Sequence, residues 1–397
     1  MLRTYRYHLY PTKEQQATLK DILWAACWLY NRALDYRRKR WNESRHSVNY
    51  YQQAGMWRDW RNEEPLATNP LRLLNMSAGQ QVLRRLDSAY RQFLKGKRGF
   101  PRFKKASRFN SVNYKPGDGA QVRRNRSTHR GVHTGAPAAG GTRLYVQNAG
   151  LIKVRWHRKL PDGKLKQIVV LHKPSGWYVL FQVELPEQLV EKSTNPPVGV
   201  DMGITHALAL SNGATFDSPK HLQASLKRLR VLQRSASRKK KGGKTRRKTV
   251  EKVARLHEHI ANQRLDWWHK TTRQLADTYG AIVLEDLSLE FMLQNGHLSR
   301  STHDVGLGMF RDLLDYKAVG AGVEIITVNP RNTSQACSGC GRIVVKDLSV
   351  RIHSCPDCGL TVDRDVNAAL NVLSLGRRDW ALTWPVAASV VQDAPPL

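Results

Sequence analysis

The sequence lacks any apolar run of the roughly 20 residues that a helix needs to cross a bilayer. Its first residues, Met1 to Tyr5, open directly into an alternating pattern and contain no apolar signal core. No basic amphipathic anchor or lipidation signal stands out. These absences argue against a membrane-bound or secreted protein, and we expect a reducing cytoplasm.

Acidic residues are scarce relative to basic ones. The 397 residues include 65 Lys and Arg but only 32 Asp and Glu, which gives a formal net charge of +33. A charge of this size opposes compact folding by self-repulsion and calls for a polyanionic partner. Nucleic acid is the commonest such partner, and an anionic membrane surface fits less well because no anchor accompanies the charge.

Cysteine is also scarce, and its placement is informative. Four of the five cysteines form two C-x-x-C pairs, Cys337 with Cys340 and Cys355 with Cys358. This is the spacing of a zinc ribbon, in which two tight turns supply four thiolates to one tetrahedral Zn²⁺. Two disulfides are the alternative, which the expected reducing compartment disfavours. Four thiolates leave no open position for water, so we expect a structural zinc that does not need the nearby His353.

The N-terminal half predicts a small β-barrel with a helical region inserted into it. Thr12 and Gln15 form a capping box at the start of a long amphipathic helix, and Cys27 lies beside its apolar stripe as a small buried side chain. From about residue 115 to 142 the chain is rich in Gly, Arg and Ser and predicts a mobile basic loop. The expected strands are 4–9, 144–146, 151–156, 167–171 and 177–183.

The C-terminal half predicts an α/β domain. Val198–Asp201 and Ala281–Glu285 are short apolar strands that each end in a carboxylate, and Val323–Val328 is a third apolar strand. A hairpin with its turn at Asn212-Gly213 follows the first strand, and two long helices lie between the first strand and the second. This order of elements is typical of a ribonuclease-H-like domain, whose site lies at the carboxyl ends of the strands.

Three carboxylates are the candidate catalytic residues. Asp201 and Glu285 end apolar strands, and Asp365 lies at the start of a predicted helix. If they converge they repel one another unless cations lie between them, and two Mg²⁺ ions about 4 Å apart can clamp a phosphodiester. The alternative roles are a turn residue, a strand-end charge and a helix N-cap, respectively.

Near neighbours complicate this assignment. Asp286 competes with Glu285, and Asp363 competes with Asp365. Asn367 is a candidate for orienting water or the scissile phosphate, and a helix-cap role fits it equally well. Trp267, Trp268 and His269 follow on a helix and are expected to serve in packing.

Two basic segments are candidate nucleic-acid contacts. In the first, Phe100 and Phe103 alternate with basic residues, which suits contacts to both bases and phosphates. The second is a dense basic linker between the two long helices. Either segment can instead be a solvated surface, since such contacts are electrostatic and carry no sequence information. The candidate residues are Arg102, Lys104, Lys105, Arg238, Lys239, Lys240 and Lys241.

Four ordered motifs of different chemistry resemble the TnpB (OrfB) proteins of bacterial and archaeal insertion sequences, the ancestors of the compact type V CRISPR effectors. The resemblance is strongest from about Pro197 to Gly376, and it also includes Tyr7–Gln15 and Gly99–Phe103. The four motifs are Gly199–Ile204 (GVDMGI), Val283–Leu287 (VLEDL), Thr333–Gly341 (TSQACSGCG) and Asp363–Leu370 (DRDVNAAL).

The resemblance implies a multidomain α+β fold with a RuvC-like nuclease domain. Asp201, Glu285 and Asp365 match the family's catalytic carboxylates, and the two C-x-x-C pairs match its zinc ligands. The implied division is a wedge-like barrel (1–14 and 143–195), a helical recognition domain (15–115), a basic loop (116–142), a RuvC-like domain (196–334 and 362–376), a zinc ribbon (335–361) and a tail (377–397).

The implied activity is RNA-guided cleavage of DNA. Such proteins bind a guide RNA transcribed from the transposon end, recognise a short motif beside the double-stranded target and cut through one Mg²⁺-dependent site. We therefore expect association with the nucleoid. Three alternatives remain at this point: a DDE-type transposase acting on transposon ends, a non-cleaving RNA-guided repressor, and a plain RNA-binding protein with a zinc ribbon.

Overall fold

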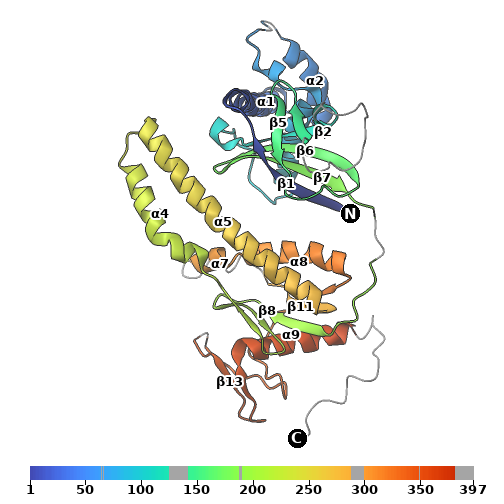
Figure 1. Ribbon diagram of the computed structural model, residues 1–397. Coiled ribbons are helices and arrows are strands. Elements are labelled where there is room, and N and C mark those ends of the chain that lie inside the picture. Colours follow the sequence, from blue (N-terminus) through green and yellow to red (C-terminus); the bar gives the residue numbers. More distant parts are fainter. Residues whose placement is uncertain are drawn as a thin grey trace. The chain divides into compact units, whose positions relative to one another are not determined.

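The computed structural model describes residues 1–63, 65, 67–124, 142–186, 190–287, 299–347 and 349–380. The chain divides into two compact units, Met1–Gln188 and Leu189–Leu397 (Figure 1). Each unit has its own apolar core, and we describe each by itself. No helix in the described part of the chain is long and apolar enough to cross a membrane.

The first unit is built on a closed barrel of seven strands in the order β1-β5-β4-β3-β2-β6-β7. β1 closes the barrel, because it pairs antiparallel with both β5 and β7. The strands are β1 Leu2–Tyr10, β2 Ser111–Pro116, β3 Gly119–Arg124, β4 Thr142–Val146, β5 Gly150–Arg155, β6 Lys164–Lys173 and β7 Gly176–Glu184.

The barrel corrects one prediction from the sequence. The sequence predicts a helical domain that ends at residue 115 and a loop over 116–142, but β2 and β3 occupy the end of the first and the start of the second. Ala120 of β3 is buried and pairs with Val146 of β4. Pairing with β4 therefore holds this segment as a strand, although its Gly- and Arg-rich composition predicts a loop. Residues 125–141 lie outside the described residues.

Helices fill the connection between β1 and β2. α1 (Lys13–Ser44) starts at the predicted capping box, in which Thr12 accepts from the Gln15 backbone N–H and the Gln15 side chain accepts from that of Thr12. Cys27 is buried on this helix as predicted. The other helices here are α2 Tyr50–Asn62, η1 Pro70–Leu73, α3 Met76–Leu94 and η2 Ala106–Arg108.

The second unit contains a five-stranded sheet in the order β10-β9-β8-β11-β12. The three neighbouring strands β8, β11 and β12 run parallel to one another. β9 and β10 form the antiparallel hairpin predicted at Asn212-Gly213, and β9 pairs antiparallel with β8. The strands are β8 Pro197–Asp201, β9 His206–Leu210, β10 Thr215–Asp217, β11 Ala281–Glu285 and β12 Glu324–Val328.

Helices cover both faces of this sheet. On one side α5 (Lys244–Thr278) and α8 (Leu307–Ala321) pack through the fully buried Trp268 and Phe310, as expected for Trp268. On the other side α9 (Arg364–Trp380) packs against β8 (Figure 1). A Cβ at Gly199 would stand 2.1 Å from the Ala369 carbonyl oxygen, so only glycine permits this close approach.

The remaining elements of this unit are shorter or extend from the sheet. α4 (His221–Ser237) pairs with α5 in a helical hairpin, and α7 is Ser299–Val305. β13 (Ile352–Ser354) and β14 (Thr361–Asp363) form a small ribbon just before α9. α9 runs to Trp380, so the first residues of the predicted tail continue a helix. Residues 381–397 lie outside the described residues.

Candidate metal sites

Asp201 and Glu285 emerge from the same edge of the sheet. Each is the last residue of a parallel strand, and β8 and β11 are direct neighbours with Val200 opposite Leu284. Their side chains therefore leave the sheet at the same level, as predicted for strands that both end in a carboxylate. Asp365 joins them from the first turn of α9, which packs against β8.

The three carboxylates act on one another electrostatically. Burial, and after it the nearby negative charges of Glu285 and Asp365, raise the pKa of Asp201 to about 8. The backbone N–H of Met202 and the positive charge of Arg364 oppose this shift. The structure thus brings the three predicted residues into one charged cluster that disfavours simultaneous ionisation without a cation.

Glu285 and Asp286 differ in how far their side chains are exposed to solvent. Glu285 is only 5% exposed, and burial raises its pKa against the opposing effects of a Thr333 hydrogen bond and the Arg311 charge. Arg311 also donates to the Glu285 backbone carbonyl. The Asp286 side chain is 78% exposed, and its carboxylate lies 3.9 Å from a guanidinium nitrogen of Arg311. Glu285, not Asp286, therefore belongs to the cluster.

Asp363 and Asp365 differ in the hydrogen bonds that their side chains make. Asp363 accepts from the backbone N–H groups of Asp365 (2.8 Å) and Val366 (3.2 Å), so Asp363 is the N-cap of α9. Asp365 is free of that role, is 15% exposed, and lies 3.7 Å from a guanidinium nitrogen of Arg351. A second Arg351 nitrogen donates to the Thr205 hydroxyl at 3.1 Å.

Sequence analysis missed Arg351 and Thr333 as members of this site. Both lie far from Asp201 along the chain. Thr333 begins the motif Thr333–Gly341, which does not by itself indicate a contact with Glu285, and nothing in the local sequence of Arg351 marks it as a site residue. Asn367 was considered for positioning water or capping a helix, and the structure contradicts both roles. It is fully buried, accepts from the Ser338 N–H (2.9 Å) and donates to the Ala336 carbonyl (2.7 Å). Asn367 therefore ties α9 to the first cysteine pair.

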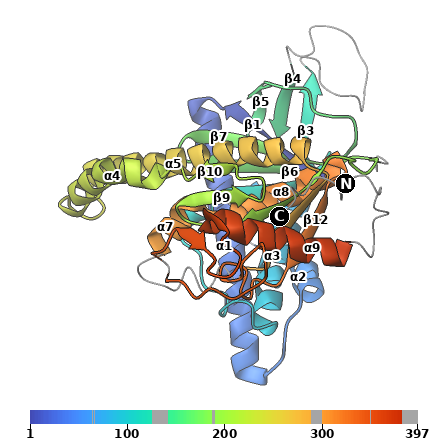
Figure 2. The same ribbon diagram turned by 90° about the horizontal axis from the view of Figure 1, so that it is seen from below.

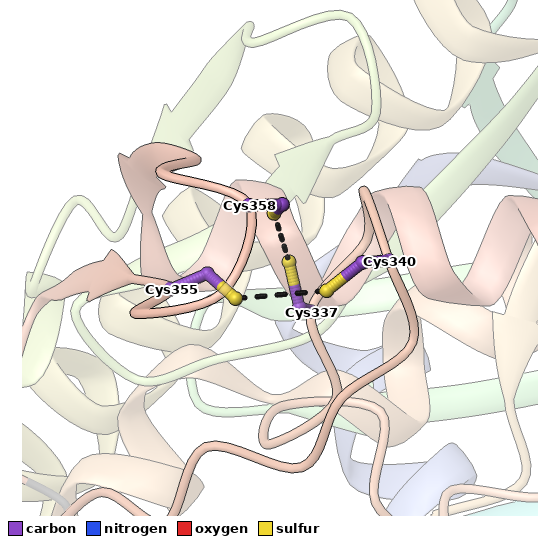
Figure 3. Close-up of side chains that lie close together, drawn as sticks. All are labelled: Cys337, Cys340, Cys355 and Cys358. Carbon is purple, nitrogen blue, oxygen red and sulfur yellow. Dashed lines mark hydrogen bonds between the residues drawn. The ribbon is translucent and has the colours of Figure 1, made fainter.

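The four paired cysteines converge on one point (Figure 3). Their sulfur atoms all lie within 4.8 Å of one another, with Cys337 Sγ 3.5 Å from Cys358 Sγ and Cys340 Sγ 3.6 Å from Cys355 Sγ. These separations are far longer than a disulfide bond, and all four cysteines are free. Converging free thiols are the donor set of a tetrahedral metal site.

The two cysteine turns have the same backbone design. The Cys337 N–H donates to the Arg342 carbonyl at 2.8 Å, and the Cys355 N–H donates to the Leu360 carbonyl at 2.9 Å. Gly341 (φ +80°) and Gly359 (φ +72°) each take the left-handed conformation that closes the turn. The backbone N–H of Cys358 lowers the pKa of Cys355 to about 7, which favours the thiolate that a metal requires.

His353 stands apart from this donor set. Its ring is fully buried beside the cysteines, and Lys346 contacts its Nδ1. Burial and the Lys346 charge lower its pKa. The four-sulfur cluster is complete without it, in agreement with the sequence analysis.

The predicted nucleic-acid contacts are divided between the two units. Lys104 is tied to α1, where its backbone N–H donates to Asn31 and its ammonium group lies over the Tyr30 ring. Lys239 hydrogen-bonds Thr249, so it stabilises the turn between α4 and α5. The other predicted residues are exposed: Arg102, Lys105, Arg238, Lys240 and Lys241.

Three family models match the chain. Residues 180–296 match a model described as "Probable transposase", and residues 308–372 match one described as "Cas12f1-like, TNB domain". A model described as "Helix-turn-helix domain" matches residues 1–46. In the structure that last range is the strand β1 followed by the single helix α1.

The chain is similar over most of its length to curated proteins. It is 32% identical over 94% of its length and 89% of the length of a Streptomyces pristinaespiralis protein named "Putative RNA-guided DNA endonuclease". It is 29% identical over 94% of its length and 92% of that of the Escherichia coli (strain K12) "Putative RNA-guided DNA endonuclease InsQ".

A solved structure confirms the overall fold. The protein in a cryo-EM structure of a Cas12f1–sgRNA–target DNA complex aligns with a TM-score of 0.57 at 14% identity, over 91% of this chain and 83% of that one. The barrel and the mixed α/β architecture are therefore shared with this compact effector. Together with the full-length sequence similarity, this shows that the chain belongs to the TnpB (OrfB) family.

Proposed function

We propose that this protein is an RNA-guided, metal-dependent DNA endonuclease with one catalytic site at Asp201, Glu285 and Asp365. The observation that carries the proposal is the convergence of these three carboxylates, where burial and then the charges of Glu285 and Asp365 raise the pKa of Asp201 to about 8. Residues from β8, β11 and α9 are gathered at a cost in electrostatic free energy, which a structural role would not require. A bound cation removes that cost.

The donor set fits Mg²⁺. Carboxylate oxygens are the hard ligands that Mg²⁺ prefers, and three of them suit the two-ion arrangement of many nucleases. When bound, Mg²⁺ supplies the positive charge that allows the three groups to ionise together and stabilises the charge of the reacting phosphodiester. Hydrolysis then forms a bond from the water oxygen to phosphorus and breaks one phosphorus–oxygen bond of the DNA backbone.

The other residues of the site hold the carboxylates and add charge. Thr333 and Arg311 contact Glu285 from different elements, so they fix the end of β11. Asp363 caps α9 and thereby fixes the helical turn that carries Asp365. Arg351 lies 3.7 Å from Asp365 on the exposed side of the site, where its guanidinium is suited to contact a DNA phosphate.

The four cysteines are proposed to hold a structural Zn²⁺ in a zinc ribbon. Their convergence, the paired turns and the lowered pKa of Cys355 support this assignment. The five-stranded sheet with α5, α8 and α9 is proposed to be the RuvC-like domain into which the ribbon is inserted. The division into wedge-like, recognition, RuvC-like and ribbon parts is likewise proposed, with β2 and β3 now assigned to the wedge-like barrel.

The proposed partners are a guide RNA from the transposon end and double-stranded target DNA. The names of the full-length relatives and the net charge of +33 support both. In such a complex base pairing reads the target, while the protein holds phosphates. We propose Arg102, Lys104, Lys105 and Arg238–Lys241 among these contacts.

The test is cleavage by protein co-expressed with the RNA of its own locus. DNA targets matching the guide would carry a randomised flanking sequence, and reactions would contain Mg²⁺ or EDTA. We expect guide-matched cutting with Mg²⁺ that is lost with EDTA and in Asp201→Ala. Guide-dependent binding without cutting by the wild type would favour the repressor. Joining of transposon ends to target DNA would favour the DDE-type transposase.

A further inference from the structure

The hairpin of α4 and α5 carries an uncompensated positive charge. The 33 residues from Ser218 to Val250 contain 13 Lys and Arg residues and no Asp or Glu. Surface helices commonly pair basic residues with acidic ones three or four positions away, and this segment cannot do so. The charge therefore repels itself unless a polyanion lies against the hairpin.

Only one side of α4 is used for packing. Leu229 forms a small apolar cluster with Leu256 and Ile260 of α5, and Ala236 is buried on the same side. Both ribbon views show the hairpin extending away from the sheet of this unit (Figures 1 and 2). The opposite face of α4 is left to solvent and holds the basic residues.

That exposed face forms a shallow groove. Arg230, Arg234 and Arg238 line it together with Gln233 and Ser237. Within the described residues, no carboxylate lies in ion-pair distance of these three guanidinium groups, in contrast to the paired Arg264 and Asp304 nearby. The three arginines are thus available to an external anion.

The spacing of the arginines has a direct structural meaning. They recur every four residues, so their Cα atoms rise by about 6 Å at each step along the helix. This is close to the separation of neighbouring phosphates along one strand of an A-form helix, and it is shorter than the separation in B-form DNA. Each guanidinium presents a planar pair of donors that suits a phosphate.

We propose that the Arg230–Arg234–Arg238 groove binds one strand of an A-form RNA helix through three consecutive phosphates. The contact is independent of base sequence, because the groove offers only phosphate-binding groups. The inference deepens the proposed function by assigning a binding surface for the helical part of the guide RNA, and it rests on that function for the identity of the RNA.

The experiment measures binding of the full-length protein to an RNA duplex of about 20 base pairs, long enough to span several phosphates on each side of the contact. A DNA duplex of the same sequence is measured in parallel, and both are titrated over a range of salt concentrations. The variant is Arg230→Gln, Arg234→Gln and Arg238→Gln together. Glutamine retains helix propensity, and circular dichroism would verify that the variant folds.

We expect the variant to bind the RNA duplex more weakly, with a slope of log K against log salt that is smaller by about 3. Binding to the DNA duplex should change less. The matched control removes three exposed charges from α5, through Lys244→Gln, Arg247→Gln and Lys248→Gln, and should change the slope by at most about 1.

Three results would overturn the inference. Equal losses in both triple variants would show that only total charge matters. A larger effect on DNA than on RNA would make DNA the partner of the groove. An unchanged RNA affinity would remove the groove from binding altogether, even if guide-dependent cleavage persists. Absence of cleavage despite groove-dependent RNA binding would instead count against the proposed nuclease.

Discussion

The second unit contains two candidate metal sites that differ in how they are built. The four cysteine sulfurs already lie within 4.8 Å of one another, and they are the one group of three or more potential ligands in the described residues that reaches this compactness. Asp201, Glu285 and Asp365 lie near one another, and the charges of Glu285 and Asp365 help to raise the pKa of Asp201. The cysteine site is closed, because four thiolates leave no position for water on the metal, and the carboxylate site is open.

The difference follows from the chemistry and the chain distance of the ligands. Neutral thiols can approach closely before metal arrives, and both cysteine turns are local structures held by their own backbone hydrogen bonds. Buried carboxylates repel, so they stay apart until cations lie between them. Under the proposed function the cysteine site would stabilise the fold and the carboxylate site would carry out the chemistry, and four experiments test this comparison.

The largest expected effect is on cleavage. Glu285→Gln should reduce the rate of DNA cutting by about 10³-fold or more, because the buried charge at the end of β11 is removed while its shape remains. Asp286→Asn is the matched control, since its side chain is 78% exposed. It should cut within about threefold of the wild type. Equal losses in the two variants, measured as single-turnover rates, would contradict our assignment of Glu285.

The second effect is on stability and zinc content. Cys337→Ser should lose the bound zinc, measured by elemental analysis, and should lower the free energy of unfolding by several kcal/mol, because zinc binding is coupled to folding of the ribbon. Cys27→Ser is the control, as Cys27 lies in the other unit and binds no partner sulfur in the described structure. Zinc retained at full occupancy in Cys337→Ser would exclude a four-cysteine site.

The third effect tests the link between the two sites. Asn367→Ala removes the two hydrogen bonds of Asn367 to the first cysteine turn, so the Ser338 N–H loses this partner while the Ala336 carbonyl keeps its hydrogen bond from Asn371. We expect a loss of about 1–3 kcal/mol in the free energy of unfolding. The zinc content should be unchanged. Denaturant titration that shows no loss would mean that α9 and the ribbon are held together by other contacts.

The smallest effect concerns pH. The pKa of Asp201 is raised from 3.8 to about 8 in the folded protein, so the folded state holds a proton that the unfolded state has released. The metal-free protein should therefore lose stability as pH rises from about 4 to about 8. Asp201→Asn removes this loss.

Thermal unfolding in EDTA would check this prediction. The melting temperature of the wild type should fall by a few degrees between pH 6 and pH 8 relative to that of Asp201→Asn. Mg²⁺ should restore the wild type at pH 8 and leave the variant unaffected. If the melting temperatures of wild type and variant change in parallel with pH, the pKa of Asp201 is not raised in the folded protein.

Much of the fold could be predicted from local pattern. The capping box at Thr12, the hairpin at Asn212-Gly213 and the apolar strands ending at Asp201 and Glu285 all depend on residues close together in the chain. β3 could not be predicted, because it has only Ala120 and Val122 as inward-facing apolar residues. Its order comes from pairing with β4, which is a long-range interaction.

The site shows the same division. The cysteine spacing alone indicated a four-ligand site, and the carboxylates that end two of the three apolar strands indicated the edge of the sheet. The choice of Asp365 over Asp363 depended on which carboxylate caps α9, and the choice of Glu285 over Asp286 depended on which one is buried. Arg351 and Asn367 have roles set wholly by what lies beside them.

The sequence by itself therefore determined the charge of the protein, its cysteine site, its principal helices and strands, and the three candidate carboxylates. These features are encoded by composition, by spacing and by the period of apolar residues, all of which act over a few residues. Only the tertiary structure decided how the barrel closes, which neighbours Arg351 and Asn367 contact, and how strongly Asp201 is perturbed. Those properties depend on distance and burial between segments far apart in the chain, and local sequence does not encode them.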